Sequence, residues 1–202
     1  MEKDTINHKE FMDLMSKIHQ KHLGCRPIDK TEGELLSALT NIYSINNKMI
    51  HVLEVGTCVG YSTCWLFKGI IEGRSKGSIH TIEINDGRFK QALFNIAKLR
   101  QIKGFESAPE KIKIIHGDAV EEIDKINESI DIAFIDANKE DYLHYLEHIK
   151  IKLKLGGILT AHNVISHKSQ MSDFLEEIGN NERWNSVLIP TSSGMALSIK
   201  KF

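Results

Sequence analysis

The stretch His51–Ser62, HVLEVGTCVGYS, decides the fold that the sequence predicts. It starts within a β-rich run, Ile50–Val55, and continues into a loop in which Gly56 and Gly60 lie four residues apart. Glycines directly after a strand allow a tight turn and let the backbone approach a ligand closely. A helix-like segment over 61–72 follows, so the stretch is typical of the first strand–loop–helix unit of an α/β sheet.

The same alternation of strands and helices continues after this stretch. Further β-rich runs are Ser78–Glu83, Lys111–Ile115, Ile130–Ile135 and Gly157–Ala161, and the helix-like segments between and after them are 86–101, 119–126, 140–153 and 169–179. Such alternation requires right-handed crossovers and predicts a parallel sheet. The last runs, Ser186–Ile189 and Met195–Lys200, are too close for a crossover helix and should pair antiparallel. The predicted fold class is α/β: a doubly wound, Rossmann-like, mostly parallel seven-stranded sheet with an antiparallel C-terminal hairpin and helices on both faces.

Two amphipathic helices are predicted before the glycine loop. The first covers residues 8–22, with Phe11, Leu14, Met15 and Ile18 at helical spacing. The second covers 32–43, and its buried side is expected to carry Leu35, Leu36, Leu39 and Ile42.

Composition excludes several classes of protein. The chain has 202 residues, 41% of them hydrophobic, and its formal net charge of -1 gives no global field for nucleic acid. Cys25, Cys58 and Cys64 form no CxxC pair, which favours reduced thiols. The charged start, residues 1–4, does not lead into an apolar signal-peptide segment, and no run approaches the roughly 20 apolar residues of a membrane span. A cytoplasmic protein without membrane association is expected.

Acidic residues lie at the ends of three successive strands, at the edge where sheets of this kind bind ligands. They are Glu54, Glu83 and Asp118. The loop lacks GxGxxG spacing, and a carboxylate at its mouth would repel a pyrophosphate but attract an ammonium or a sulfonium. S-adenosylmethionine is therefore favoured over NAD. We expect Glu83 to accept from the ribose hydroxyls and Asp118 from the adenine amino group, although each acid alone would be an ordinary surface or N-cap residue.

Several motifs together resemble one known family. They are Leu53–Thr63, Phe134–Lys139 with Tyr142 and Tyr145, Gly156–Gly157 leading to Asn163, and the closing Gly194–Ser198. From about Pro27 to the C-terminus, the sequence resembles the metal-dependent O-methyltransferases that include catechol and caffeoyl-CoA O-methyltransferases. The resemblance implies S-adenosylmethionine as the methyl donor, a hydroxyl as the acceptor, a divalent cation (Mg²⁺ or Mn²⁺) and a homodimer. It also implies one methyltransferase domain over 1–202, with helices in 1–45 that include a candidate lid and a cofactor-binding and catalytic core over 46–202.

The resemblance assigns residues to the site. The expected cofactor contacts are Glu54, Gly56, Thr57, Gly60, Tyr61, Ser62, Glu83, Asp118, Ala119 and Asp136. Lys139, three residues after Asp136, matches the general base of the family, and a neutral lysine takes a proton from the acceptor hydroxyl. Tyr142 and Tyr145 are expected to pack the helix that follows.

The expected metal ligands are Asp136, His162 and Asn163. Position 162 carries an Asp in the family, so three alternatives stay open. His162 ligates the metal and favours Mn²⁺, Fe²⁺, Co²⁺ or Zn²⁺; or Asp136 and Asn163 bind it more weakly together with the substrate; or there is no metal and His162 acts as a base.

The acceptor is expected to be a small catechol-like or other hydroxylated aromatic. One alternative is a hydroxylated uridine of transfer RNA, which a basic strip formed by Lys98, Arg100, Lys103, Lys111 and Lys113 would contact through phosphates. Another is a protein that binds S-adenosylmethionine with impaired catalysis, suggested by His162 and by Ser192–Ser193, where many relatives carry an acid. An NAD-dependent reductase is disfavoured by Glu54 and by the glycine spacing.

Overall fold

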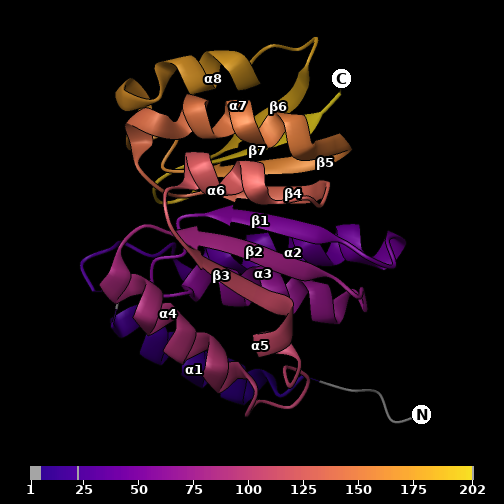
Figure 1. Ribbon diagram of the computed structural model, residues 1–202. Helices are drawn as coiled ribbons and strands as arrows, with labels where there is room; N and C mark the ends of the chain where they lie inside the picture. The colour runs from indigo at the N-terminus through magenta and orange to yellow at the C-terminus, as the bar shows by residue number, and fades with distance from the viewer. Residues whose placement is uncertain (1–5, 22, 202) are drawn as a thin grey trace.

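The computed structural model describes residues 6–21 and 23–201 (Figure 1). The charged start at residues 1–4 and the predicted end of the first helix at residue 22 lie outside this range. None of the helices in the described part of the chain is long and apolar enough to cross a membrane.

One seven-stranded sheet runs through the molecule. Its strands are β1 (His51–Val55), β2 (Ser78–Glu83), β3 (Ile112–His116), β4 (Ile130–Ile135), β5 (Leu153–His162), β6 (Trp184–Ile189) and β7 (Met195–Lys200). Their order is β3-β2-β1-β4-β5-β7-β6, in which the first five strands are parallel and β7 is antiparallel to both β5 and β6. The predicted fold class is confirmed. The chain order reverses between β1 and β4, where sheets of this type form a ligand crevice.

Helices cover both faces of the sheet. They are α1 (His8–Gln20), α2 (Lys30–Asn46), α3 (Tyr61–Glu72), α4 (Asp86–Leu99), α5 (Ala108–Lys111), α6 (Ala119–Lys125), α7 (Tyr142–Lys152) and α8 (Ser172–Ile178), with 3₁₀ turns η1 (Lys139–Asp141) and η2 (Lys168–Gln170). In Figure 1, α6, α7 and α8 lie along the β4–β6 half of the sheet, and α2 and α3 along the β1–β3 half.

The buried strands divide their side chains between two cores because successive residues of a strand point to opposite faces. Val52 and Ile132 join the core under α1 to α5, whereas Leu53 and Ala133 join the core under α6 to α8. Both faces of the central strands are therefore buried, which explains their nearly continuous apolar sequence.

Helix α1 is docked on α3 by the apolar face that its spacing predicts. Phe11 packs edge-to-face against Trp65 and stacks on Phe105, with ring centroids 5.1 Å apart in both pairs. Leu14 and Ile18 are buried beside it.

The predicted buried face of α2 is only partly correct: Leu36 is buried in the core and Leu35 packs against it, but Ile42 is not buried. Ile42 is 64% exposed, and the face turned to α3 consists largely of small residues, among them Ser37 and Ser44. A β-carbon at Gly69 of α3 would collide with the backbone oxygen of Ser37, and one at Gly73 with the side chain of Ser44. Small side chains on both helices let the two backbones approach closely, and this packing outweighs the burial of larger apolar side chains.

Two of the three cysteines are not reduced thiols, which corrects the sequence prediction. Cys25 and Cys58 form a disulfide, with their Cα atoms 6.3 Å apart, whereas Cys64 is a buried free thiol. The pair is separated by 33 residues and has no sequence signature. The fold joins them because the segment between α1 and α2 lies over the glycine loop.

Candidate active site

A cavity of about 770 Å³ opens at the carboxyl ends of the parallel strands. Its volume is in the range of sites that enclose a small molecule or cofactor. Most of the predicted cofactor contacts line it, namely Gly56, Thr57, Tyr61, Ser62, Glu83, Asp118, Ala119 and Asp136. Lys139 and Asn163 line it as well, whereas Glu54, Gly60 and His162 do not.

The glycine loop shapes one wall of the cavity. Gly56 has φ 100°, and a β-carbon there would collide with the backbone oxygen of Asp136. The amides of Gly56 and Thr57 both donate to the carbonyl of Ile82, at 3.0 and 3.1 Å. Gly60 has φ 84° and caps α3, so it shapes the turn and is not one of the lining residues.

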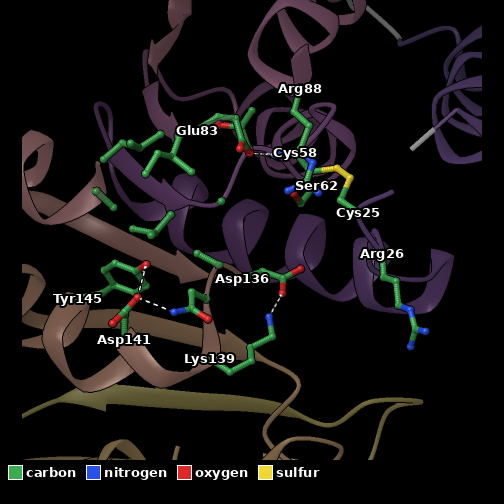
Figure 2. Close-up of a pocket in the computed structure, with 18 of the residues that line it drawn as sticks. Cys25, Arg26, Cys58, Ser62, Glu83, Arg88, Asp136, Lys139, Asp141 and Tyr145 are labelled. Carbon is green, nitrogen blue, oxygen red and sulfur yellow. Dashed lines mark hydrogen bonds and ion pairs between the residues drawn. A yellow bond between two sulfur atoms is a disulfide. The ribbon is translucent and has the colours of Figure 1, made fainter. Parts of the chain in front are cut away.

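Glu83 holds the loop and lies in the cavity wall (Figure 2). Its two carboxylate oxygens accept from the amide of Cys58 at 2.7 Å and from the amide of Asn85 at 2.9 Å. Each oxygen keeps a further lone pair, because a carboxylate offers about four acceptor positions. Asp118 caps α6 through the amide of Val120, at 2.9 Å, and it also lines the cavity.

Glu54 lies beneath the loop, not at its mouth, which corrects the predicted position. It is fully buried, and it accepts hydroxyl hydrogen bonds from Ser62 and Thr63 at 2.5 Å and from Thr81 at 2.6 Å. Burial raises the pKa of Glu54 to about 7 although the three hydroxyls act in the opposite direction. Glu54 therefore ties β1, β2 and α3 together below the cavity.

Asp136 and Lys139 form the charged part of the opposite wall, and in Figure 2 their side chains point toward each other. Asp136 follows β4, and Lys139 begins η1. The ammonium nitrogen of Lys139 is 2.8 Å from Oδ1 of Asp136 and 3.2 Å from the hydroxyl of Tyr142. Tyr142 in turn donates to the backbone carbonyl of His162 at 3.0 Å, so the lysine is fixed from two sides.

His162 ends β5 and lies behind this pair, between two carboxylates. Its Nδ1 faces Oδ2 of Asp136 at 3.3 Å without the alignment of a hydrogen bond, and its Nε2 is 3.1 Å from the carboxylate of Glu32. Both His162 and Glu32 are buried. Sequence reasoning did not find Glu32, which belongs to the first turn of α2.

The opposite charges in this cluster determine the protonation of its members. Burial alone raises the pKa of Glu32, but hydrogen bonds with His162 and the amide of Asp29 outweigh it, and the pKa falls to about 2. Burial alone lowers the pKa of His162, but its contacts with Asp136 and Glu32 raise it to about 9. Burial likewise raises the pKa of Asp136, but His162 and Lys139 lower it below its usual value.

The three predicted metal ligands do not converge on one point. The ring nitrogens of His162 face carboxylates, and Oδ1 of Asp136 is bonded to Lys139. The side-chain amide of Asn163 donates to the hydroxyl of Ser166 at 3.4 Å. Within residues 6–21 and 23–201, no group of three His, Cys, Asp or Glu side chains is placed to hold a metal ion. The residues present therefore do not fit the predicted three-ligand cation site.

Several lining residues have no signal in the sequence. They come from the segment before α2 (Cys25, Arg26, Pro27 and Ile28), from α4 (Arg88), from η1 (Asp141), and from the residue before η2 (His167). Tyr145 packs α7 as predicted, and it also lines the cavity. Glu32 has a partial signal, because Asp29-x-x-Glu32 is a capping box that marks the start of a helix.

The fold and the cavity define a Rossmann-like α/β domain with a ligand site at the switch point of its sheet. Residues 53–164, more than half of the chain, match the model of the family described as Methyltransferase domain, and the chain belongs to this family. The resemblance inferred from the sequence is confirmed.

Similar proteins agree with this assignment. The chain is 29% identical over 143 residues to tapetum-specific methyltransferase 1 of Arabidopsis thaliana, a match covering 69% of this chain and 54% of that protein. It is 27% identical over 165 residues to caffeoyl-CoA O-methyltransferase of Populus kitakamiensis, covering 78% and 64%. The match thus spans about half to two thirds of the length of these relatives. The O-methyltransferase from Bacillus cereus, solved in complex with SAH, shares the fold with a TM-score of 0.77 at 21% identity, over 96% of this chain and 92% of that one.

Proposed function

We propose that the chain is an S-adenosylmethionine-dependent O-methyltransferase that methylates a hydroxyl of a small hydroxylated aromatic compound. The observation that carries the proposal is the juxtaposition of two walls in one cavity. One wall offers Gly56, Glu83 and Asp118, and the other offers Asp136 and Lys139. We call them the cofactor half and the acceptor half.

The cofactor half suits an adenosyl ligand. Because Gly56 has no side chain, the loop packs directly against the backbone of Asp136, and the backbone of the loop lines the cavity. Glu83 keeps free acceptor positions for the ribose hydroxyls, and Asp118 offers one for the adenine amino group. Its predicted contacts Thr57, Tyr61, Ser62 and Ala119 also line the cavity. When bound, S-adenosylmethionine supplies an electrophilic methyl group.

The acceptor half supplies the proton acceptor. Methyl transfer to oxygen requires that the hydroxyl lose its proton and that the oxygen be held in line with the methyl group. Lys139 in its neutral form takes this proton, and Asp136, 2.8 Å away, fixes the lysine beside the cavity. Tyr145 and Pro27 offer apolar surface to an aromatic ring in the same cavity.

Other expectations from the resemblance remain proposals. The segment Cys25–Ile28 lines the cavity, which supports the lid role proposed for the N-terminal region. The single domain over 1–202 and the homodimer are proposed on the family resemblance alone. Size-exclusion chromatography with light scattering tests the dimer.

Transfer RNA receives less support as the acceptor. Lys98 and Arg100 lie at the end of α4, and Lys111 and Lys113 surround the start of β3. They are therefore at the amino end of the parallel strands, whereas the cavity opens at the carboxyl ends. Arg100 is also paired with Glu110.

The proposal is tested by methyl transfer and by cofactor binding. With S-adenosylmethionine that carries a labelled methyl group, we expect the label to appear on catechol and substituted catechols and not on transfer RNA. Calorimetry should detect binding of S-adenosylhomocysteine, weakened about tenfold or more in Glu83→Gln because a hydrogen bond to a charged group is lost. Glu121→Gln, an exposed acid on α6, is the matched control. A folded protein that takes up no S-adenosylhomocysteine overturns the proposal, and uptake without transfer to any acceptor would leave a cofactor-binding protein.

A further inference from the structure

His162 is held away from the cavity by a carboxylate that the sequence did not associate with it. It is 3% exposed and does not line the cavity, although it ends β5 at a position where the resembled family carries a metal-binding Asp. Its ring lies between Asp136 at 3.3 Å and Glu32 at 3.1 Å. Both ring nitrogens of His162 therefore face carboxylate oxygens of the protein, and neither is turned into the cavity.

Glu32 is itself fixed and is not a mobile surface acid. Its Oε2 accepts from the amide of Asp29 at 2.9 Å, and its own amide donates back to Oδ1 of Asp29 at 2.9 Å. The hydroxyl of Ser192 donates to Oδ2 of Asp29 at 2.9 Å and lies 3.5 Å from Oε1 of Glu32. A carboxylate in the first turn of a helix is also stabilised by the helix dipole. The capping box of α2 thus positions Glu32 against His162.

The two carboxylates of the cluster already face nitrogen groups of the protein. The ring of His162 lies between Glu32 and Asp136, at 3.1 and 3.3 Å, and the side-chain nitrogen of Lys139 is 2.8 Å from Asp136. A divalent cation bound to Asp136 would lie beside both of these nitrogen groups, which would compete with it for the same carboxylate. Mg²⁺ and Mn²⁺ prefer oxygen ligands, and Asp136 alone of these three groups offers oxygen to the cavity.

We propose that the Glu32–His162 pair takes the place of the divalent cation of the resembled family, so that this chain positions Asp136 and Lys139 without a metal ion. The proposal rests on the proposed function, because it concerns the same acceptor half. Glu32 and His162 are positioning residues here. It follows that the acceptor needs no second oxygen for chelation, and that a single phenolic hydroxyl is sufficient.

Metal binding tests the proposal independently of activity. The full chain is titrated with Mn²⁺ up to about 1 mM, with and without S-adenosylhomocysteine, and uptake is measured by calorimetry and electron paramagnetic resonance. The site-specific uptake is the amount of Mn²⁺ that a protein binds minus the amount that it binds when it also carries Asp136→Asn. We expect none in the wild type and about one equivalent in the double variant Glu32→Gln, His162→Asp, which supplies carboxylate and amide ligands. If the wild type binds one equivalent of Mn²⁺ and the Asp136→Asn variant does not, the proposal is overturned, whether or not the double variant folds.

Kinetics test the positioning role. We expect methyl transfer to persist in EDTA. We also expect phenol, which has one hydroxyl, to be methylated in addition to catechol. Glu32→Gln should lower kcat about tenfold or more while KM stays within about twofold, because binding is retained but the proton acceptor is misplaced. Glu34→Gln, an exposed acid on the same helix, should leave both parameters unchanged. Loss of transfer in EDTA with recovery in Mn²⁺, or an unchanged kcat in Glu32→Gln, overturns the proposal. If no acceptor is methylated at all, the proposed function fails and the Mn²⁺ titration still decides this inference.

Discussion

The two halves of the cavity hold their buried carboxylates by different means. Beneath the cofactor half, Glu54 is bonded to three neutral hydroxyl groups, and its pKa rises to about 7 because burial prevails over them. Behind the acceptor half, Glu32 faces the cation His162, and its pKa falls to about 2 although burial opposes this. Hydroxyl groups satisfy a buried carboxylate but do not replace the water that stabilises its charge, whereas a cation does. The comparison distinguishes a neutral scaffold under the cofactor from a charged cluster beside the acceptor.

The largest effect is expected where the charged cluster meets the cavity. Lys139→Ala removes the proposed proton acceptor and should lower kcat for methyl transfer by about 10²–10⁴-fold. Binding of S-adenosylhomocysteine should stay within about twofold, because the cofactor half is unchanged. Steady-state rates and calorimetry measure the two effects separately. Lys125→Ala, which removes an exposed lysine of α6, is the control, and equal rates in both variants would contradict the division into halves.

The disulfide ties the glycine loop of the cofactor half to the segment that leads into α2. Cys58 belongs to the glycine loop, and Cys25 precedes the helix that carries Glu32. Closing a loop of 33 residues should stabilise the fold by about 3–4 kcal/mol through the entropy of the unfolded chain. Denaturant unfolding of Cys25→Ser should show this loss, and the wild type with reductant should match the variant. Identical unfolding of the wild type with and without reductant would rule out a stabilising link.

The smallest effect concerns the neutral scaffold and is seen in the pH dependence of stability. The folded-state pKa of Glu54, about 7, is above its ordinary value of 4.5, so the folded protein binds this proton more tightly than the unfolded chain. The stability that it contributes is complete below pH 4.5 and is lost as the pH rises through about 7, by at most about 3 kcal/mol. Glu54→Gln should lack this decline. Denaturant titrations at several pH values test it, and parallel stability curves for both proteins would contradict the raised pKa.

The sequence alone was sufficient for the sheet. The runs Ser78–Glu83, Ile130–Ile135 and Met195–Lys200 coincide with β2, β4 and β7, because strands buried on both faces have long apolar runs. It was insufficient for the face of α2, where the contact with α3 depends on small residues that carry no hydrophobic signal. The short α5 was also missed, since four residues give no periodicity.

The site was predicted in its composition but not in its arrangement. Motif spacing found Glu83, Asp118, Asp136 and Lys139, all of which line the cavity. It could not place His162, because the direction of this side chain depends on Glu32, 130 residues earlier in the chain. A contact of that range is a property of the fold and leaves no local pattern.

The close packing of α2 on α3 has a consequence for natural and engineered variation. Gly33 follows Glu32 directly, and a β-carbon there would collide with the indole of Trp65 in α3. A β-carbon at Gly69, about one helical turn after Trp65 in α3, would collide with the backbone of α2 and push the same two helices apart. Larger residues at these sites, which do not line the cavity, would shift the acid relative to the imidazole and lower the proposed methyl transfer while leaving every lining residue intact. Substitutions at the α2–α3 interface are therefore expected to affect the site as strongly as substitutions of residues that line the cavity.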